Sequence, residues 1–454
     1  MNDRTRWALA AVAVIGMLGV VAWVIQDDGP SLDDELAAVI SSHGLEPIDA
    51  NAAQPAALVE LGEALFWDKE LSGNRDIACA TCHHTTLGSG DALPVSIGTG
   101  GSGLGEQRVL GEGRNLVPRN APDVWNRGAD GFFTMFWDGR VSGTAEHGFT
   151  SPAGEQLPAG LPNVLAVQAM FPVTSADEMR GVPGDVDVFG NVNELGEIAD
   201  DDFSAIWDGL MERVVAIPRY VELFEAAYPD TPTDHLGFEH AAMAIAAFET
   251  NAFAADQTPW DRYLAGHRDA MDDAAKRGAL LFYGTARCAA CHSGDLLTDQ
   301  QHHNIGAPQV GPGKGEEAPD DHGRARETGS AMDMYAFRTP PLRNVTANGP
   351  YFHDGAYMDL EAAVRHHLDV LGSLAAYDVA QLRDDLELEY TDPSRTAVVV
   401  DYLDPRLATP RLLSETEIDD LMAFLEALTD PRLGDVALRI PDAVPSGLPI
   451  DRSE

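Results

Sequence analysis

The residues of this chain best suited to chemistry are Cys79, Cys82 and His83. They have the Cys-x-x-Cys-His spacing of a c-type haem attachment site. In such a site two thiols add across the vinyl groups of a haem, and the next residue places an imidazole under the iron as a fixed axial ligand. The stretch therefore predicts one covalently bound haem c, with His83 as a ligand of its iron.

The same spacing recurs once, at Cys288, Cys291 and His292, and the two stretches use all 4 cysteines of the chain. A thioredoxin-like redox pair or a zinc ribbon would not require a histidine directly after each pair of cysteines. A disulfide or coincidental use of these cysteines is the alternative. We favour two haem c groups, with His292 as an iron ligand of the second.

The chain is strongly acidic, with 30 Lys and Arg against 73 Asp and Glu and a net charge of −43. Such a charge excludes nucleic acid and an anionic membrane surface as partners. The acidic residues are spread along the chain, with a local excess at residues 316–321. We favour a strongly solvated surface over the alternative, a docking patch for a basic protein.

The N-terminal segment, residues 1–26, has the composition of a membrane helix. Arg4 and Arg6 precede an uninterrupted apolar run at 7–25, and two aspartates follow it at 27–28. At about 1.5 Å per residue this run spans roughly 28 Å, close to the hydrocarbon thickness of a bilayer. It is long for a signal-peptide core and no clear Ala-x-Ala site follows, so we predict an uncleaved inner-membrane anchor, with a cleaved signal as the alternative. The flanking charges place the body on the periplasmic side in either case.

Two similar stretches divide the rest of the chain. A Gly-x-x-Leu-Phe pattern precedes each haem motif, at 62–66 and at 278–282, which indicates an internal duplication. Helices are expected near 55–67, 239–251 and 414–428, and the last begins with a Ser-x-x-Glu capping box formed by Ser414 and Glu417. Strand signals are few. The sequence therefore predicts a mostly α protein: two tandem cytochrome c-like domains with long loops, plus an N-terminal transmembrane helix. The predicted boundaries are 27–50 for a linker, 51–255 and 256–440 for the N- and C-terminal haem domains, and 441–454 for a tail.

Several longer stretches resemble the bacterial dihaem cytochrome c peroxidase and MauG superfamily. In the family's order they cover residues 61–72, 119–126, 136–140, 337–344 and 350–355, so the resemblance runs from about residue 55 to about residue 430. Residues 171–181 resemble a MauG-like branch that includes the methanobactin-associated dihaem enzymes. The resemblance implies a haem-dependent peroxidase whose substrate is hydrogen peroxide.

The resemblance implies that the first haem is the reaction centre. In the peroxidases a histidine in the loop after the first motif often caps the distal side of the iron, but the matching loop at 95–101 has Thr99. Threonine is a poor iron ligand, so this haem is expected to be open to peroxide; a cap by another side chain of the loop is the alternative. Glu178 matches the family's catalytic glutamate, which would move a proton from the inner to the outer peroxide oxygen. Trp137 matches the tryptophan that lies between the two haems and would relay electrons, with plain core packing as its alternative.

The second haem departs from the commonest pattern of the family. A helix after Asp359 is expected to place His367 on its apolar face and His366 off it. The family has its distal ligand here, typically Met in the peroxidases and Tyr in MauG, so His367 implies a bis-histidine iron that is harder to reduce and easier to oxidise. A buried hydrogen-bonded histidine is the alternative, with Met358 and Tyr357 as nearby replacement ligands.

The resemblance also implies one calcium ion between the domains. Asn120 matches its side-chain ligand, and the carbonyls of Asn348 and Pro350 match two others. Oxygen ligands of this kind suit a hard cation. Two further stretches, an insert between Trp137 and Glu178 and a loop-rich addition at 181–202, are either mobile or functional, as a cover for the peroxide pocket or a docking site.

These observations predict a MauG-like dihaem peroxidase that oxidises a partner protein. One alternative is a cytochrome c peroxidase that detoxifies peroxide with electrons from a small redox protein. A second is a dihaem cytochrome that transfers electrons without catalysis. An open first haem beside Glu178 argues against this last reading.

Overall fold

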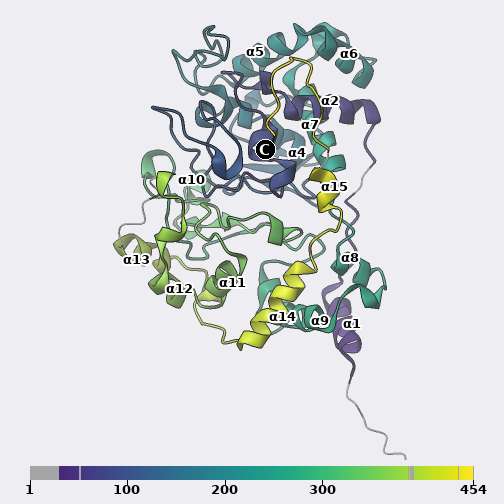
Figure 1. The fold of residues 1–454 in the computed structure, drawn as a ribbon, viewed down its shortest axis with the longest axis vertical. Coiled ribbons are helices and arrows are strands. Elements are labelled where there is room, and N and C mark those ends of the chain that lie inside the picture. The colour runs from purple at the N-terminus through teal and green to yellow at the C-terminus, as the bar shows by residue number, and fades with distance from the viewer. Residues whose placement is uncertain (1–29, 51–52, 387, 389–392, 438, 453–454) are drawn as a thin grey trace, which may run out of the picture.

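The computed structural model describes residues 30–50, 53–386, 388, 393–437 and 439–452. In this part of the chain helices dominate and the strands are short. Figure 1 shows two helical halves stacked along the longest axis, with loops between them. Each half has a hydrophobic core of its own, and a smaller third core joins residues of the loop at 93–97 to residues 310–388.

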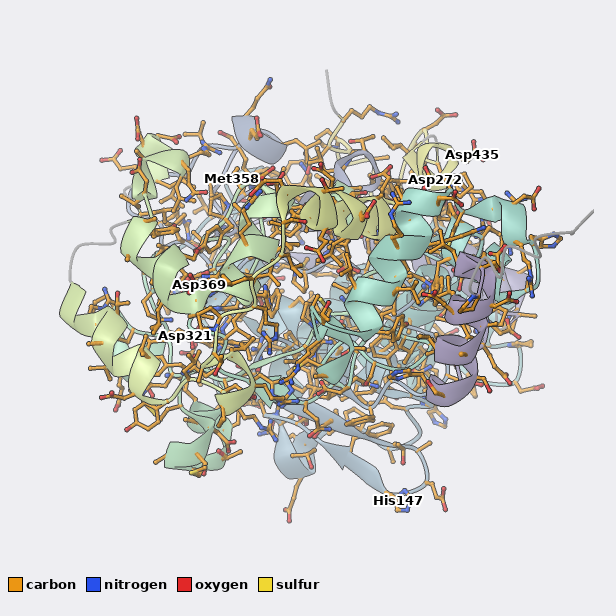
Figure 2. The ribbon with its side chains drawn as sticks, turned by 90° about the horizontal axis from the view of Figure 1, so that it is seen from below. His147, Asp272, Asp321, Met358, Asp369 and Asp435 are labelled. Atoms are coloured by element: carbon orange, nitrogen blue, oxygen red, sulfur yellow. The ribbon has the colours of Figure 1, made fainter. Side chains whose placement is uncertain are left out.

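The upper half in Figure 1 holds the first haem motif. Its helices are α2 (Ala56–Trp67), α3 (Cys79–Cys82), α4 (Val164–Ala169), α5 (Phe203–Val215), α6 (Pro218–Ala227) and α7 (Phe238–Ala252). Its strands β1 (Thr134–Met135), β2 (Val141–Thr144) and β3 (Gly148–Thr150) form an antiparallel sheet in that order. Strands β2 and β3 and helix α4 belong to the insert between Trp137 and Glu178, whereas β1 precedes it, and Figure 2 shows His147 projecting at the tip of the β2–β3 hairpin.

The lower half holds the second haem motif. Its helices are α1 (Leu32–His43), α8 (Pro259–Leu264), α9 (Asp273–Tyr283), α10 (Ala325–Thr328), α11 (Leu360–Leu368), α12 (Val370–Ala376), α13 (Pro393–Asp401) and α14 (Glu415–Glu426). Strands β4 (His302–His303) and β5 (Phe337–Arg338) pair antiparallel, and a last helix, α15 (Leu433–Ala437), returns toward the upper half. The capping box expected at Ser414 and Glu417 is present at the start of α14.

The Gly-x-x-Leu-Phe pattern has the same packing role in both halves. A Cβ on Gly62 of α2 would lie 1.9 Å from the carbonyl oxygen of Ala244 in α7, and a Cβ on Gly278 of α9 would lie 1.9 Å from that of Asp420 in α14. Only glycine therefore permits these two helix crossings. The phenylalanine four residues later then meets a phenylalanine of the crossing helix, Phe248 or Phe424, at a ring distance of 5.1 Å in each half.

The two ends of the described chain cross over between the halves. Helix α1, within the predicted linker, packs with Leu36 in the core around α9. The predicted tail instead runs back to the upper half, where Asp451 pairs with Lys69 at 2.5 Å and the Ser446 hydroxyl donates to Asp68 at 2.6 Å. The N-terminal end thus packs with the C-terminal haem half, and the C-terminal end packs with the N-terminal haem half.

The predicted transmembrane helix requires a correction. Residues 1–26 lie outside the described residues, and among those described no helix is long and apolar enough to cross a membrane. Helix α7, with 15 residues, reaches only about 22 Å at about 1.5 Å per residue, short of the roughly 30 Å that a bilayer core requires. The fold is therefore mostly helical and cytochrome c-like, without a membrane-spanning helix in the part of the chain that is described.

Candidate active site and haem-binding residues

The first haem motif forms a single helical turn that presents its side chains to one space. The His83 amide donates to the Cys79 carbonyl oxygen at 2.9 Å, which closes α3. The His83 Nδ1 lies 3.2 Å from the Ser89 carbonyl oxygen. Because a carbonyl only accepts hydrogen bonds, Nδ1 carries the proton and Nε2 is left for a metal. Burial lowers the pKa of His83 to about 4, so the ring is in the neutral form that ligates.

A cavity of about 630 Å³ opens beside this motif, between the two halves. Its walls include residues of the upper half (Cys79, Cys82, His83, Met135, Trp137, Glu178, Met179) and of the lower half (Lys314, Arg326, Arg338). His83 is the only histidine among the described residues that line it. Of the loop at 95–101, Ser96 alone reaches the lining, and its hydroxyl is a weak iron ligand.

Glu178 reaches this cavity from a short π-helix, Ala176–Arg180, which begins at the side-chain cap of Ser175. Burial raises the pKa of the Glu178 carboxyl. The positive charges of Arg140 and Lys314 oppose this rise. A carboxyl with a raised pKa beside two cations is suited to accept a proton and to return it.

Thr99 has a different place from the one expected. Its hydroxyl donates to an Asp76 carboxylate oxygen at 2.8 Å, and it is not among the residues that line the cavity. Its amide donates to the Glu178 carbonyl oxygen at 2.9 Å. Thr99 therefore supports the backbone of Glu178 rather than facing the space above the motif.

Trp137 also lines the cavity and touches both halves. Its indole Nε1 donates to the Asn120 carbonyl oxygen at 3.0 Å. Its own carbonyl oxygen accepts from the Arg338 amide of β5 at 2.8 Å. The ring is thus fixed at the junction between the two haem motifs.

The second motif repeats the arrangement of the first. The His292 Nδ1 lies 3.1 Å from the Pro340 carbonyl oxygen and 3.3 Å from that of Leu297, so Nε2 is again left for a metal. Burial and the nearby His367 lower the pKa of His292 to about 4. This interaction places His367 close to the ring that the motif presents.

The two neighbouring histidines of α11 differ in what their nitrogens do. His367 Nδ1 bonds the Ala363 carbonyl oxygen at 2.8 Å, which leaves its Nε2 for a metal. His366 is fully buried rather than off the apolar face, but Nδ1 and Nε2 both have partners, the Tyr357 hydroxyl at 3.0 Å and the Ile305 carbonyl oxygen at 2.8 Å. Tyr357, a replacement ligand in the sequence analysis, is thus committed to His366 and to Ser373 at 2.7 Å. Met358, the other replacement ligand, packs against the third core.

The charges around the cavity fit a haem, which carries two carboxylates of its own. Arg338 is buried, and burial together with the positive charge of Arg127 lowers its pKa to about 9; its guanidinium donates to the Phe136 and Thr339 carbonyl oxygens. Arg127 is paired with Asp123 at 3.1 Å, but its buried Nη1 has no hydrogen-bond partner among the described residues. A buried guanidinium with an unused donor favours an anion beside it, and the haem carboxylates would supply one.

Comparison with known proteins agrees with this geometry. A family described as di-haem cytochrome c peroxidase matches residues 56–269. The methylamine utilization protein MauG of Methylorubrum extorquens is 30% identical over 372 residues, which cover 82% of this chain and 77% of that protein. The cytochrome c551 peroxidase of Pseudomonas aeruginosa is 30% identical over 305 residues, or 67% of this chain and 70% of that one. A crystal structure of a MauG-like protein associated with microbial copper homeostasis has a TM-score of 0.58 and 25% identity, covering 86% of this chain and 94% of that one.

The chain belongs to the dihaem cytochrome c peroxidase and MauG family. The predicted family is thereby confirmed, as are the haem-dependent oxidoreductase activity and the two haems that define the family. The individual site residues and the calcium ion remain predictions.

The residues expected to bind calcium in this family lie near one another. The Asn120 side chain donates to the Leu93 carbonyl oxygen at 2.8 Å, so its own side-chain oxygen is left for another contact. A Cβ on Gly88 would lie 3.2 Å from the Asn348 Cα, and the Asn120 amide donates to the His353 carbonyl oxygen, three residues after Pro350. The loop at 88–93 therefore brings Asn120 near the 348–353 segment.

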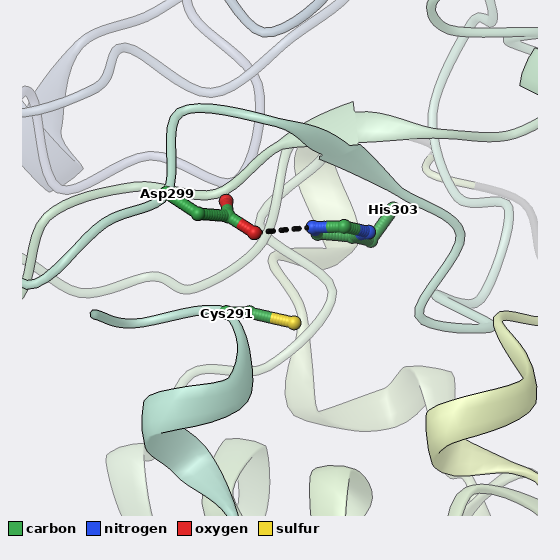
Figure 3. A group of neighbouring side chains, drawn as sticks. All are labelled: Cys291, Asp299 and His303. Carbon is green, nitrogen blue, oxygen red and sulfur yellow. Dashed lines mark hydrogen bonds and ion pairs between the residues drawn. The ribbon is translucent and has the colours of Figure 1, made fainter.

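A cluster beside the second motif resembles a metal site in its residue types (Figure 3). One ligand atom from each of Cys291, Asp299 and His303 lies within 4.8 Å of the others. In this family the Cys291 sulfur belongs to a haem thioether, and His303 bonds Asp299 at 2.8 Å and Asp404 at 3.0 Å. Burial lowers the pKa of His303. Hydrogen bonding to Asp299 and Cys291 outweighs burial and raises this pKa to about 9. We interpret the cluster as an ion pair at the edge of the second haem site.

Sequence reasoning missed three cations of the cavity: Arg140, Lys314 and Arg338. Arg140 ends the Phe-Trp-Asp-Gly-Arg block that was used only for Trp137. Arg338 similarly lies in a family-like stretch. Lys314 gave no signal, because it stands in a Gly/Pro-rich loop of the lower half that folds across to the first motif.

Proposed function

We propose that this chain reduces hydrogen peroxide at the haem held by His83 and takes the electrons from a partner protein through the haem held by His292 and His367. The cavity of about 630 Å³ carries the proposal, because it brings His83, Glu178 and Trp137 to one space and its described lining has no other histidine to close the iron. When bound, the first haem supplies an iron that takes peroxide and accepts its oxidising equivalents.

Glu178 would do the proton chemistry. Its carboxylate accepts the proton of the inner peroxide oxygen and returns it to the outer oxygen, which then leaves as water. Arg140 and Lys314 favour the ionised form needed for the first transfer, whereas burial favours the protonated form needed for the second.

Trp137 would connect the two haems. Its position against Arg338 of the lower half and its hydrogen bond to Asn120 hold an oxidisable ring at the junction. His292 and His367 would hold the second iron from opposite sides, and two imidazoles favour its oxidised form relative to a Met ligand.

We also propose one calcium ion bound by Asn120 and the carbonyls of Asn348 and Pro350. Because the Asn120 carbonyl oxygen accepts from Trp137 at 3.0 Å, the ion would also fix the indole. Removal of calcium by EGTA is expected to lower the peroxide rate, and Ca²⁺ rather than Mg²⁺ should restore it. Attachment of two c-type haems supports an extracytoplasmic location for the body of the protein.

Peroxide detoxification with a small redox protein as donor is the second candidate. It is favoured by the similarity to a cytochrome c551 peroxidase, which is as close in identity as the MauG of Methylorubrum extorquens. Both candidates share the same site and differ only in the source of the electrons.

The optical and low-temperature EPR spectra of the ferric protein, before and after one equivalent of peroxide, test the proposal. We expect one high-spin and one bis-histidine low-spin haem, both of which change with peroxide. Two low-spin haems that do not react would contradict it and indicate an electron carrier.

A further inference from the structure

We propose that Tyr283, Trp260 and Tyr263 form an electron relay from the surface beside α1 to the second haem, with Tyr263 as its outer redox residue and Asp33 as its proton acceptor. The inference rests on the proposed function, because the oxidising equivalents come from hydrogen peroxide. It assigns the route by which electrons reach the second haem, from which Trp137 would pass them to the first.

Three oxidisable rings follow one another at close range. The ring centroids of Tyr283 and Trp260 are 6.0 Å apart with an interplanar angle of 28°, and those of Trp260 and Tyr263 are 6.1 Å apart with an angle of 6°. Near-parallel aromatic rings at this spacing are in contact. Phe424 meets Trp260 edge-on at a ring distance of 5.2 Å. Because it has no phenol or indole to oxidise, it is not part of the relay.

The inner end of the series lies at the second haem motif. Tyr283 is the last residue of α9, and the Gly284 and Ala286 amides both donate to the Leu281 carbonyl oxygen, at 3.1 and 3.0 Å. This tight turn folds the chain back, so that Cys288 packs against the same hydrophobic core as Tyr283 and Trp260. The thioether carbon of the second haem would therefore border this cluster.

The outer end has a built proton acceptor. The Tyr263 hydroxyl donates to an Asp33 carboxylate oxygen at 2.8 Å, and Lys276 pairs with the same oxygen at 2.8 Å. Hydrogen bonds from Lys276 and Tyr263 lower the pKa of Asp33, which keeps it ionised, and its side chain is one-quarter exposed. Lys276 also lies 5.6 Å above the Tyr263 ring. Asp33 is thus a carboxylate at the protein surface that can take the phenol proton and exchange it with water.

The inner tyrosine lacks such a partner. The Tyr283 hydroxyl is buried with no hydrogen-bond partner among the described residues. A phenylalanine here would avoid the cost of that buried hydroxyl, so packing alone does not explain the tyrosine. Without a proton acceptor Tyr283 cannot keep a stable neutral radical, and the oxidising equivalent passes on to Tyr263.

The electron and proton counts balance. Reduction of one hydrogen peroxide to two waters takes two electrons and two protons, and the relay delivers the electrons one at a time. For each, an electron leaves Tyr263 through Trp260 and Tyr283, and its phenol proton moves to Asp33. An external reductant, or an oxidisable side chain of a partner protein at this surface, then returns one electron and Asp33 returns the proton. The two protons consumed in forming water come from the solvent.

Freeze-quench EPR of the dihaem protein after peroxide tests the relay, with ring-deuterated tyrosine to identify the radical. We expect a tyrosyl signal that narrows with the label and falls at least tenfold in Tyr263→Phe and in Trp260→Phe. Optical oxidation of both haems should be unchanged in these variants, which also shows that they are folded and loaded.

Tyr228→Phe is the matched control. Tyr228 is half-buried, and its hydroxyl donates to the His240 carbonyl oxygen at 2.7 Å, but its ring contacts are Phe224 and His240 rather than another tyrosine or tryptophan. Its radical yield should equal that of the wild type. A tyrosyl signal that survives in Tyr263→Phe, or its absence in a wild type whose haems are oxidised, would overturn the relay. Haems that ignore peroxide would overturn the proposed function and the relay together.

Discussion

At the scale of single residues, the state of the second ring nitrogen separates the histidines suited to iron from the others. His83, His292 and His367 each direct Nδ1 at a backbone carbonyl oxygen, which leaves Nε2 for a metal. His366 and His303 have partners at both nitrogens. Hydrogen bonding of the distant nitrogen orients a ligating imidazole and raises its basicity, so this difference supports the iron-ligand roles proposed for His83, His292 and His367.

Replacing Glu178 with Gln should slow the reaction of the ferric protein with peroxide by about 10²–10⁴, the usual contribution of a general acid–base group. Because burial raises the pKa of Glu178, the wild-type rate should also fall on the acid side at a pH above the about 4.3 of a free glutamate, as the accepting carboxylate is lost. Stopped-flow spectra across pH measure both effects. Glu155→Gln, at an exposed carboxylate of the insert that does not line the cavity, should keep the wild-type rate and pH profile; equal slowing in both variants would contradict the role of Glu178.

Replacing His367 with Met should convert the second haem from two imidazole ligands to one imidazole and one thioether. The reduction potential of that haem should rise by an amount on the order of 0.1 V, within the roughly 0.8 V over which axial ligands set haem potentials. Spectroelectrochemistry and low-spin EPR measure the change. His366→Gln removes the more buried neighbouring histidine and should leave both axial ligands of the second haem in place. If the ligands change in His366→Gln and not in His367→Met, His366 is the iron ligand.

At the scale of elements, the loop-rich addition at 181–202 is docked rather than loose. The Asn193 side chain donates to the Arg180 carbonyl oxygen at 2.7 Å and to the Asn74 side chain at 3.0 Å, and Arg114 pairs with Asp185 through two bonds of 2.7 and 2.8 Å. The Gly73 amide donates to the Met179 carbonyl oxygen at 2.8 Å. The addition therefore clamps the π-helix of Glu178 to the segment that leads into the first haem motif.

Replacing Asn193 with Ala removes a fully buried amide from this clamp and leaves buried carbonyl groups unpaired. We expect a loss of about 1–3 kcal/mol in the free energy of unfolding, since that is the cost of an unsatisfied buried polar group. The peroxide rate should fall as well, because the backbone next to Glu178 loses its support. Asn191→Ala, at the exposed end of the same addition, should change neither the denaturation midpoint nor the rate. An equal effect of both variants would show that the hydrogen bonds of Asn193 do not specifically hold the π-helix.

At this scale the sequence predicts the features that depend on a local pattern of residues, and it does not predict those that depend on contacts between distant parts of the chain. Helix α14 and its capping box, and the glycines of α2 and α9, follow from spacing along the chain, and the structure has them where they were expected. The clamp by Asn193 and the reach of Lys314 into the cavity depend on contacts across more than a hundred residues, for which a single sequence has no periodic signal. The burial of His366 was mispredicted because its ring is held by Tyr357 and by the Ile305 carbonyl oxygen, contacts that the periodicity of helix α11 does not reveal.

At the scale of the whole molecule, a buried network of ion pairs joins the two halves, and Arg119 is at its centre. From the upper half it pairs with Asp138 at 2.5 Å and reaches across to Asp321 of the lower half at 2.6 and 2.8 Å. All three side chains are buried, and Arg119 also lines the cavity. The first haem cavity has walls from both halves, so these pairs also keep its shape.

Replacing Asp321 with Asn should therefore weaken the union of the halves in a way that depends on pH. Although burial raises the pKa of Asp321, Arg119 outweighs it and holds the pKa well below its usual range. A carboxyl with a folded-state pKa below its unfolded value of about 3.9 stabilises the fold fully above that value, and the contribution is lost as pH falls toward the folded-state pKa. The variant should lose about 3–5 kcal/mol at pH 7, the cost of leaving one buried partner unpaired, and less at pH 3. Urea denaturation followed by haem absorbance at both pH values measures this difference.

The exposed pair of Glu60 and Arg219 is the control, since Glu60→Gln should change stability by less than about 1 kcal/mol at either pH. If Asp321→Asn behaves like Glu60→Gln at pH 7, the interdomain ion pair does not hold the halves together, and the shape of the cavity must depend on the hydrophobic contacts of the third core instead.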